Sequence, residues 1–473
     1  LFATMDWLDK IEKYLAFEPS DEQSYFIEAV YRLFQSHKSR CTLILNGYAG
    51  TGKTSIVGAL VKLFKDKKIN FVLLTPTGKS AKVLQRYSGF PAFTIHKHVY
   101  QQVVKNGNRY FSRKANKFTN TVFIVDEVSM ISGEEKFFSD GNNASLLSDL
   151  VDYVFEGQNC KLVMMGDQAQ LPPVHSVLSP ALDSERMRND FDLLLAKCHF
   201  TQVHRQEHNS GVLINATALR YKITGKSDNL HWDWHFSDFR TLTAYDLPEV
   251  YDDSISKHGA EEVIIICRSN KQALKYNQAI RSRVLYMEEE LNGGDRLMVV
   301  KNNYYHQLPE QGIHFIANGE SVSINRVIGH EEKYGLHFAD VDLHLDDYDC
   351  DIQAKLIIDV LNSEQASLEE AKQTILYESI DAELHETIPN KTERREAMRQ
   401  NPYLNALQVK YAYAITGHKS QGGQWDVVLT DCGFAFDLDE LNDARWLYTA
   451  ITRSKQQFYW LNYQEPKKEE EED

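Results

Sequence analysis

The chain has 473 residues and a mass of 54.5 kDa, and a typical domain size of about 150 residues predicts roughly three domains. Hydrophobic residues make up 42% and charged residues 25%, which is typical of globular proteins and excludes the disordered and fibrous classes. With 52 basic and 67 acidic residues the net charge is -15, so any contact with nucleic acid must use a local basic surface.

Apolar runs and cysteines indicate the compartment. No apolar run approaches the roughly 18 residues of a membrane span, and residues 1–20 lack the apolar core of a signal peptide. The six cysteines are far apart and include no CxxC pair, which argues against a disulfide scaffold and against a zinc site. We therefore expect a cytoplasmic protein without a membrane partner.

In the first half, short apolar runs alternate with helix-like stretches, which predicts buried parallel strands in an α/β sheet. These runs are 41–45, 71–74, 122–125 and 162–165. A second set predicts a second α/β domain, and its runs are 263–267, 427–429 and 458–461.

The region between about 296 and 405 differs in kind. Apolar and polar residues roughly alternate over 336–345, as in half-buried antiparallel strands, and Asn318-Gly319 predicts a turn. Residues 363–400 are charged and rich in Ala and Glu, which favours helix. The segment 331–386 holds 16 acidic and three basic residues. It is either a solvated surface or a docking face for a protein partner.

The segment Gly47 to Thr54 reads GYAGTGKT and matches G-x-x-x-x-G-K-[ST] between an apolar strand and an apolar helical stretch. Its glycines let backbone N–H groups surround phosphates, and the following helix N-terminus adds positive potential. Lys53 would reach the β- and γ-phosphates, and the Thr54 hydroxyl would bind Mg²⁺. The sequence therefore predicts an ATP site.

Two later strands are expected to end in polar residues at the same edge of the sheet. The strand 122–125 runs into Asp126 and Glu127. Asp126 is placed to hold Mg²⁺, and Glu127 can orient and deprotonate the attacking water. The strand 162–165 leads to Gln170, which could bond the γ-phosphate and the water, or could belong to a plain strand–turn.

Two arginines and one glutamine are further candidates. An arginine can stabilise the charge that spreads over the γ-phosphate during transfer. Arg205 ends the first α/β half and Arg453 lies in the second; from position alone, surface salt bridges are equally compatible. Gln23 pairs with Ser20 in an S-x-x-Q capping box, and the alternative is an amide that contacts adenine.

The segment 75–120 has a positive net charge, whereas the whole chain is negative. It holds nine Lys and Arg residues, no Asp or Glu, and interleaved aromatic residues. Cations for phosphates and rings for base stacking are typical of a groove for a single strand, and the alternative is a solvated face with core aromatics. Asn106-Gly107-Asn108 predicts the tip of a hairpin, which could act as a wedge at a duplex junction.

The ordered motifs resemble superfamily 1B helicases of the RecD, Dda and Pif type. The resemblance covers residues 23–455 and rests on Gln23 with the segments GYAGTGKT (47–54), TPTGKSAKVL (75–84), TIH (94–96), DEVSM (126–130), GDQAQLPPV (166–174), VHRQ (203–206), TGHKSQGG (416–423) and LYTAITRSK (447–455).

This resemblance implies two RecA-like P-loop domains with parallel sheets, a small pin-hairpin insertion and an SH3-like β-barrel insertion with a helical extension. The expected domains are 1–95 with 121–205 (1A), 96–120 (1B, with the pin), 206–300 with 405–465 (2A), 301–404 (2B), and a charged tail at 466–473.

The resemblance also implies ATP- and Mg²⁺-dependent 5′→3′ movement on single-stranded DNA and unwinding of forked duplex DNA, by a monomer in a bacterial or phage-infected cell. ATP would close a cleft between the two domains. Gln170, Arg205 and Arg453 become γ-phosphate sensors and Gln23 an adenine contact. Further implied nucleotide contacts are Gly47, Ala49, Gly50, Thr51, Gly52, Lys53, Thr54, Ser55 and Gly422. Implied DNA contacts are Thr77, Lys79, Phe93, His96, Lys97, Asn270, His418 and Lys419.

Some positions depart from the family pattern. Gly417 stands where Ile or Val is usual, Gln424 where Glu is frequent, and the segments 133–145 and 363–400 are enlarged. Two other functions remain open: an RNA helicase or RNA-stimulated ATPase of the same superfamily, and a nucleotide-gated binding module that does not unwind. A nuclease is disfavoured, because no further carboxylate cluster has metal-ligand spacing.

Overall fold

The computed structural model describes residues 2–105, 108–133, 136–137, 143–174, 176–203, 210–308, 315–346, 348–433 and 436–463. The chain divides into two compact units. Unit 1 comprises Leu1–Glu207, Gly293–Lys410 and Gln421–Gly423. Unit 2 comprises His208–Asn292, Tyr411–Ser420 and Gln424–Asp473.

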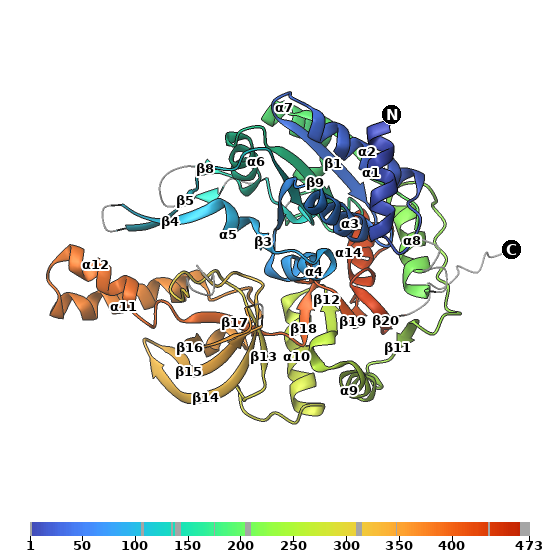
Figure 1. Ribbon diagram of the computed structural model, residues 1–473. Coiled ribbons are helices and arrows are strands. Elements are labelled where there is room, and N and C mark those ends of the chain that lie inside the picture. Colours follow the sequence, from blue (N-terminus) through green and yellow to red (C-terminus); the bar gives the residue numbers. More distant parts are fainter. Residues whose placement is uncertain are drawn as a thin grey trace. The chain divides into compact units, whose positions relative to one another are not determined.

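Unit 1 contains a parallel sheet of six strands in the order β10-β1-β9-β6-β2-β3. Figure 1 labels β1, β9 and β3 of this sheet. The strands are β1 (Cys41–Gly47), β2 (Asn70–Thr75), β3 (Ala92–Thr94), β6 (Thr121–Val125), β9 (Lys161–Gly166) and β10 (Leu194–Phe200). All four apolar runs predicted in this half are strands. Because β1, β6 and β9 are adjacent and parallel, their carboxyl ends meet at one edge of the sheet.

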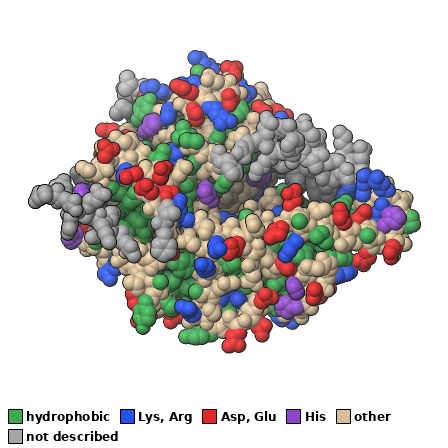
Figure 2. All heavy atoms as spheres, turned by 180° about the vertical axis from the view of Figure 1, so that it is seen from behind, with side chains coloured by type: hydrophobic (Ala, Val, Ile, Leu, Met, Phe, Trp, Pro, Cys, Tyr) green, Lys and Arg blue, Asp and Glu red, His purple; other side chains and the backbone are tan. Residues whose placement is uncertain are grey.

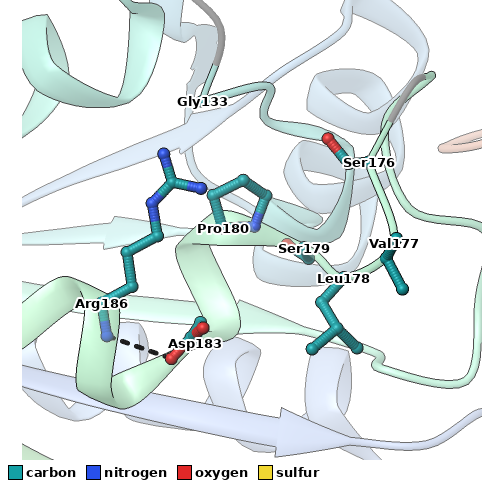
Figure 3. Close-up of a pocket in the computed structure, with 8 residues that line it drawn as sticks. All are labelled: Gly133, Ser176, Val177, Leu178, Ser179, Pro180, Asp183 and Arg186. Carbon is teal, nitrogen blue, oxygen red and sulfur yellow. Dashed lines mark hydrogen bonds between the residues drawn. The ribbon is translucent and has the colours of Figure 1, made fainter.

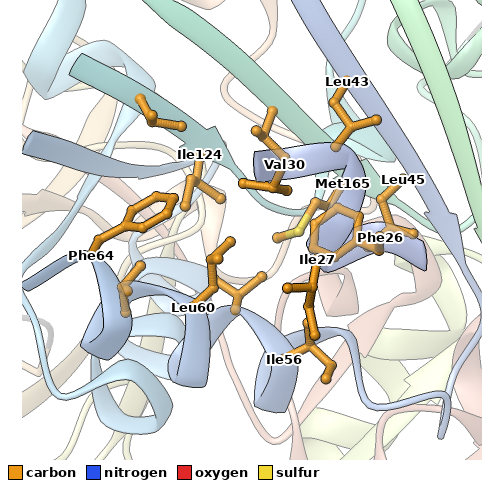
Figure 4. Packing of buried hydrophobic residues seen from close by; sticks show 14 of the residues in the cluster. Phe26, Ile27, Val30, Leu43, Leu45, Ile56, Leu60, Phe64, Ile124 and Met165 are labelled. Atoms are coloured by element: carbon orange, nitrogen blue, oxygen red, sulfur yellow. The ribbon is translucent and has the colours of Figure 1, made fainter. Parts of the chain in front are cut away.

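Helices of unit 1 connect and cover these strands. They are α1 (Phe2–Ile11), α2 (Asp21–Gln35), α3 (Lys53–Asp66), α4 (Gly78–Ser88), α5 (Ile95–Val99), α6 (Leu146–Glu156) and α7 (Ser184–Phe191), with short 3₁₀ helices η1 (Glu12–Tyr14), η2 (Val128–Met130) and η3 (Pro180–Leu182). Figure 4 shows α2 contributing Phe26 and Ile27, and α3 contributing Leu60, to a core against Leu45 of β1. This packing fixes both helices beside the strand that carries the phosphate loop.

Two small antiparallel pairs lie in this half of the chain. Strands β4 (Tyr100–Lys105) and β5 (Asn108–Arg113) form the predicted hairpin, with Lys105 opposite Asn108. Its central turn residues, 106 and 107, lie outside the described residues. Strands β7 (Lys136–Phe137) and β8 (Asn143–Ala144) pair within the segment that is longer than the family pattern.

A closed barrel and two helices also belong to unit 1 (Figure 1). The barrel strands are β13 (Arg296–Val299), β14 (Ser321–Lys333), β15 (Leu336–Leu345), β16 (Cys350–Ile357) and β17 (Leu407–Tyr411), with η7 (Ile358–Val360) after β16. The charged stretch forms α11 (Glu370–Thr387) and α12 (Lys391–Gln400), as predicted. The predicted turn is present, since Gly319 has φ +93° and Glu320 N donates to Ala317 O.

Unit 2 contains a second parallel sheet, in the order β11-β20-β19-β12-β18. Its strands are β11 (Phe239–Leu242), β12 (Val263–Cys267), β18 (Ala414–Thr416), β19 (Trp425–Asp431) and β20 (Ser454–Leu461). Its helices are α8 (Gly211–Ile223), α9 (Leu247–His258), α10 (Asn270–Arg283), α13 (Gly417–Ser420) and α14 (Leu441–Ile451), with η5 (Ala260–Glu262). All three apolar runs predicted here are strands.

The expected fold class is confirmed: an α/β protein with two parallel sheets and a small β-barrel within the second half of the sequence. The barrel begins at Arg296 and ends at Tyr411, a few residues outside the expected 301–404. The expected tail at 466–473 lies outside the described residues. Of the helices the structure describes, none combines the length and apolar character that crossing a membrane requires.

Candidate nucleotide and DNA site

The phosphate loop connects β1 to α3, and its conformation depends on glycine. Gly50 and Gly52 have φ values of +73° and +77°, in the left-handed region that side chains disfavour. Thr51 stabilises the loop because its hydroxyl donates to Tyr48 O at 2.7 Å. Ala49 lies within this turn, and Ser55 is exposed in the first turn of α3. The strand–loop–helix arrangement is therefore the one that a phosphate site needs.

Lys53 begins α3 and folds back over the loop. Its ammonium group donates to the carbonyl oxygens of Gly47 and Tyr48, the latter at 3.0 Å. A Cβ atom on Gly47 would lie 2.6 Å from the Lys53 side chain, so only glycine leaves room for it. These bonds are to backbone carbonyls, and the ammonium group can exchange them for phosphate oxygens without breaking an ion pair.

Asp126 and Glu127 follow β6 at the same sheet edge. Asp126 is 8% exposed, and one of its oxygens accepts a hydrogen bond from Glu127 N at 2.8 Å. Burial, and next the charge of Glu127, raise the pKa of Asp126 to about 7, while Lys53 acts in the opposite direction. Glu127 has φ +54°, a strained value for a non-glycine residue.

These residues fit a magnesium ion. Mg²⁺ is usually held by one or two protein oxygens together with substrate phosphates and water, and the Asp126 carboxylate and Thr54 hydroxyl provide such oxygens. A buried carboxylate with a raised pKa is one that a cation would stabilise in its charged form. Among the described residues, no group of three or more His, Cys, Asp or Glu side chains could hold a metal ion.

Replacing Asp126 with Asn should stabilise the protein without nucleotide. The folded-state pKa of about 7 exceeds the ordinary 3.8, so ionisation of Asp126 costs stability as the pH rises from about 4 to about 7. Chemical denaturation should therefore show little difference in unfolding free energy between variant and wild type at pH 4 and a clear gain for the variant at pH 7. An equal gain in unfolding free energy at both pH values would contradict the raised pKa of Asp126.

Two glutamines follow β9, and the structure distinguishes them. Gln168 is held by Asn46 on β1, because its backbone N donates to Asn46 Oδ1 at 3.0 Å and its Oε1 accepts from Asn46 Nδ2 at 3.2 Å. Gln170 is 5% exposed, and its Oε1 is buried without a hydrogen-bond partner among the described residues. A buried acceptor of this kind is costly, which favours a role for Gln170 over the plain strand–turn.

Gln23 has the capping role that its spacing predicts. Ser20 N donates to Gln23 Oε1 at 3.0 Å, and Gln23 N donates to Ser20 Oγ at 3.3 Å. Its Nε2 also donates to Thr51 O in the phosphate loop at 3.0 Å, and the side chain is 1% exposed. The predicted adenine contact of this amide stays a prediction.

The structure describes only one of the two predicted arginines. Arg205 lies outside the described residues. Arg453 directly follows α14 in unit 2 and is 3% exposed. Its guanidinium donates to Thr449 O at 3.1 Å and to Thr452 Oγ1 at 3.2 Å. A surface salt bridge is therefore the wrong interpretation for Arg453, because the side chain is buried.

Gly422 and Thr77 meet within unit 1. Gly422 has φ +73°, and a Cβ atom there would lie 2.9 Å from Thr77 Oγ1. Thr77 is the N-cap of α4, because its hydroxyl accepts from Ser80 N at 3.2 Å. Lys79 lies in the first turn of the same helix. The predicted roles of Gly422 at the nucleotide and of Thr77 and Lys79 at DNA stay predictions.

The remaining predicted DNA contacts of unit 1 form an aromatic and cationic group. Phe93 is 36% exposed, and Lys97 Nζ lies 5.9 Å from the centre of its ring. Lys97 also lies 5.6 Å from the ring of Tyr348 on the barrel, and burial lowers its pKa. His96 lies edge-on to Phe315 at 6.3 Å. No signal in the sequence links Tyr348 to this group, because the two positions are far apart in the chain.

Some cations of the 75–120 segment are engaged by the protein itself. Arg113 pairs with Glu156 at 2.6 Å, Lys114 Nζ donates to Lys97 O at 2.9 Å, and Lys82 donates to Asp346 O. Fewer than nine cations are therefore free to neutralise phosphates without rearrangement.

Several acidic residues of the segment 331–386 form ion pairs with cations of the protein itself. Lys355 bridges Asp340 and Glu331, and Arg326 pairs with Asp342 at 2.7 Å. Figure 2 shows acidic and basic side chains interspersed over the face that it displays. These ion pairs favour a solvated surface, and a protein partner at this segment stays a prediction.

Three predicted DNA contacts lie in unit 2. Asn270 begins α10 at the end of β12, while His418 and Lys419 lie in α13 after β18. Burial lowers the pKa of Lys419 to about 8. The departure at Gly417 has a steric explanation, since a Cβ atom there would lie 2.3 Å from the Trp446 indole nitrogen. Trp446 thus occupies the space that a larger side chain at Gly417 would need.

A separate pocket of about 360 Å³ lies beside η3 and α7 (Figure 3). Arg186 N donates to Asp183 Oδ1 at 3.1 Å at the start of α7. None of the predicted site residues lines this pocket. The residues that line it are Gly133, Ser176, Val177, Leu178, Ser179, Pro180, Asp183 and Arg186.

The phosphate loop, the Asp126–Glu127 pair and the parallel sheet define a P-loop NTPase fold. Residues 20–222 match the family described as AAA domain, and residues 411–460 match the UvrD-like helicase C-terminal domain. Both matches are compatible with the resemblance of its motifs to superfamily 1B helicases of the RecD, Dda and Pif type.

Two curated relatives and one solved structure are similar to this chain. The chain is 24% identical over 424 residues to the ATP-dependent RecD2 DNA helicase of Deinococcus radiodurans, covering 88% of this chain and 46% of that protein. It is 28% identical over 206 residues to the ATP-dependent DNA helicase dda of Enterobacteria phage T4, covering 42% of each. Less than half of each of these relatives is thus matched. A crystal structure of Pif1 helicase from Bacteroides in complex with ADP-AlF3 and ssDNA has a TM-score of 0.47 at 16% identity, covering 94% of this chain and 92% of that chain.

Proposed function

We propose that this protein is an ATP-dependent DNA helicase that moves 5′→3′ along single-stranded DNA and unwinds duplex DNA. The observation that carries the proposal is the meeting of Lys53, Asp126 and Glu127 at one sheet edge, in a chain whose motifs follow the helicase order. The relatives RecD2 and dda are named as ATP-dependent DNA helicases, which supports the substrate class. The direction rests on the family resemblance.

Each residue of the candidate site would have a separate role in ATP hydrolysis. Thr54 and Asp126 would hold Mg²⁺ together with the nucleotide phosphates, and the ion would neutralise charge on the β- and γ-phosphates. Lys53 would exchange its carbonyl partners for phosphate oxygens. Glu127 would accept the proton of the attacking water, and Gln170 would orient that water through its buried amide oxygen.

Charge that develops on the γ-phosphate needs additional cations. We assign this role to Arg205 and Arg453, since a planar guanidinium can bind two oxygens at once. Gln23 would couple the base end of the nucleotide to the phosphate loop through its bond to Thr51 O. The other glycines and hydroxyls of the loop supply backbone donors to the phosphates.

DNA would contact both units. In unit 1, Phe93 supplies a ring for base stacking and Lys97 a charge for the backbone. In unit 2, Asn270, His418 and Lys419 lie at the carboxyl ends of β12 and β18. The β4–β5 hairpin would separate the strands of a fork. We propose that the protein acts on forked DNA as a monomer.

Unwinding of three matched duplexes tests this function. We expect ATP-dependent strand separation of forked and 5′-tailed duplexes and little of a 3′-tailed duplex. Stronger stimulation of ATP hydrolysis by RNA than by DNA would favour the RNA helicase alternative. Nucleotide-dependent DNA binding without separation of any duplex would instead favour a nucleotide-gated binding module.

A further inference from the structure

Asn46 joins the end of β1 to the loop that follows the neighbouring strand β9. Its Oδ1 accepts a hydrogen bond from Gln168 N at 3.0 Å, and its Nδ2 donates to Gln168 Oε1 at 3.2 Å. The side chain of Asn46 is 1% exposed, so little water reaches these bonds. A buried amide whose donor and acceptor are both satisfied by one residue holds that residue in place.

The hydrogen-bond pattern also determines how the two amide groups are oriented. A backbone N–H can only donate, so the Asn46 atom that faces Gln168 N must be the oxygen. The Asn46 nitrogen then faces Gln168 Oε1, and Gln168 Nε2 donates to Leu182 O at 3.3 Å. A directed chain of hydrogen bonds therefore runs from β1 through Gln168 to η3.

This contact lies between the phosphate loop and Gln170. Asn46 directly precedes Gly47, the first residue of the phosphate loop. Gln170 lies two residues after Gln168, and its backbone N donates to Asp167 O at 3.3 Å within the same turn. Holding Gln168 against β1 therefore restricts where the side chain of Gln170 can lie.

The position of this turn matters because of the Gln170 amide oxygen. The oxygen is buried and, in the part of the chain that the structure describes, accepts no hydrogen bond. A buried acceptor without a partner is costly, and the water that attacks the γ-phosphate could donate to it. A displaced turn would let the oxygen meet solvent instead, so the turn must be held for the oxygen to stay available to that water.

We propose that Asn46 is a positioning residue for ATP hydrolysis, which holds the loop 167–170 against β1 so that the Gln170 amide faces the attacking water. The inference rests on the proposed function of Gln170. Asn46 acts through Gln168 and does not itself contact the nucleotide. Its loss should therefore lower kcat and leave the KM for ATP nearly unchanged, because the orientation of the water contributes to the transition state.

The chain offers a matched control for the loss of a buried asparagine. Asn215 on α8 is 0% exposed, and its amide makes the same two kinds of bond to one residue. Its Oδ1 accepts from Asp233 N at 2.8 Å, and its Nδ2 donates to Asp233 O at 2.9 Å. Because Asp233 is not a predicted site residue, Asn215→Ala measures what the loss of two buried amide bonds does to folding alone.

The experiment measures ATP hydrolysis by the full chain with single-stranded DNA present, and unfolding temperature as a check on folding. Asn46→Ala should lower kcat by about ten- to a hundredfold, as expected for a catalytic group that is slightly misplaced, at nearly unchanged KM. Asn215→Ala should lower the unfolding temperature but keep kcat near that of wild type. Asn46→Ala added to Gln170→Ala should cause no further loss of kcat.

A milder variant keeps the inference testable should Asn46→Ala not fold. Gln168 is half-buried, and Gln168→Ala removes its side-chain bonds to Asn46 and Leu182 but keeps its backbone bond to Asn46. We expect this variant to lower kcat several-fold, less than Asn46→Ala, at unchanged KM.

Two results would overturn the inference alone: a kcat of Asn46→Ala equal to that of Asn215→Ala, or an undiminished effect of Asn46→Ala when Gln170→Ala is already present and slow. The second result would show that Asn46 acts by a route other than Gln170. A wild-type rate in Gln170→Ala would be different. It would refute the proposed role of Gln170, and the inference would fail with it.

Discussion

Replacing Lys53 with alanine should lower ATP hydrolysis by about three orders of magnitude or more while the protein remains folded. The ammonium group is the cation that starts α3 and contacts the phosphate loop, so its removal takes charge away from the β- and γ-phosphates. Its present partners are backbone carbonyls, and losing such bonds should cost on the order of 1 kcal/mol of stability. Steady-state hydrolysis and thermal unfolding measure the two effects separately.

Lys65→Ala provides the control for Lys53→Ala. Lys65 lies on the same helix, in its last turn, and is exposed, so its removal changes the charge of α3 without touching the loop. We expect near-normal hydrolysis from this variant. If Lys53→Ala hydrolysed ATP as fast as Lys65→Ala, the assignment of the phosphate loop would be wrong.

Replacing Arg453 with alanine should slow hydrolysis by about three orders of magnitude or more while nucleotide still binds. An arginine that stabilises charge in the transition state contributes to kcat rather than to ground-state binding. Its burial at 3% exposure and its bonds to Thr449 and Thr452 hold the guanidinium in one orientation. Fluorescent-nucleotide binding and single-turnover hydrolysis distinguish the two steps.

Two further variants show whether a loss of activity in Arg453→Ala comes from the missing guanidinium or from a folding defect. Arg453→Lys keeps the charge but lacks the planar fork, so it should remain strongly impaired. Lys455→Ala removes a nearby charge that pairs with Glu262 at 2.6 Å and with Asp426 at 2.8 Å, and it should hydrolyse ATP nearly normally. Normal hydrolysis by Arg453→Ala would show that the essential arginine lies elsewhere.

The fold was predictable where a short apolar run sufficed to define a buried strand. The runs 41–45 and 263–267 form the interior strands β1 and β12, each of which has a neighbouring strand on both sides. Edge strands were not predicted: β10 is exposed at several positions and β3 has three residues. Neither pattern differs clearly from that of a loop, because an edge strand does not need a continuous apolar run.

The candidate site was predictable where function depends on neighbours in sequence. The loop 47–54 and the pair Asp126 and Glu127 are contiguous motifs, and the topology of a parallel sheet places their strand ends at one edge. Contacts between distant segments carried no such signal. Glu22 meets Thr201, and Lys97 meets Tyr348, through packing that no spacing rule specifies.

Gly417 and Gln23 illustrate the limits of motif comparison. Gly417 departs from the family pattern because Trp446 occupies the neighbouring space, and the compensation is visible only in three dimensions. Gln23 was open to a capping or an adenine role, and the structure shows the capping box together with an additional bond to the phosphate loop. One side chain therefore combines helix capping with support of the site.

The central claim is that ATP hydrolysis is coupled to a single strand of DNA bound by the same chain. ATP turnover by the full chain should be measured with and without saturating single-stranded DNA, at low salt because phosphate contacts weaken as salt rises. We predict that the strand raises kcat at least about tenfold and that Lys53→Ala abolishes turnover under both conditions. Turnover that is the same with and without the strand would contradict the account.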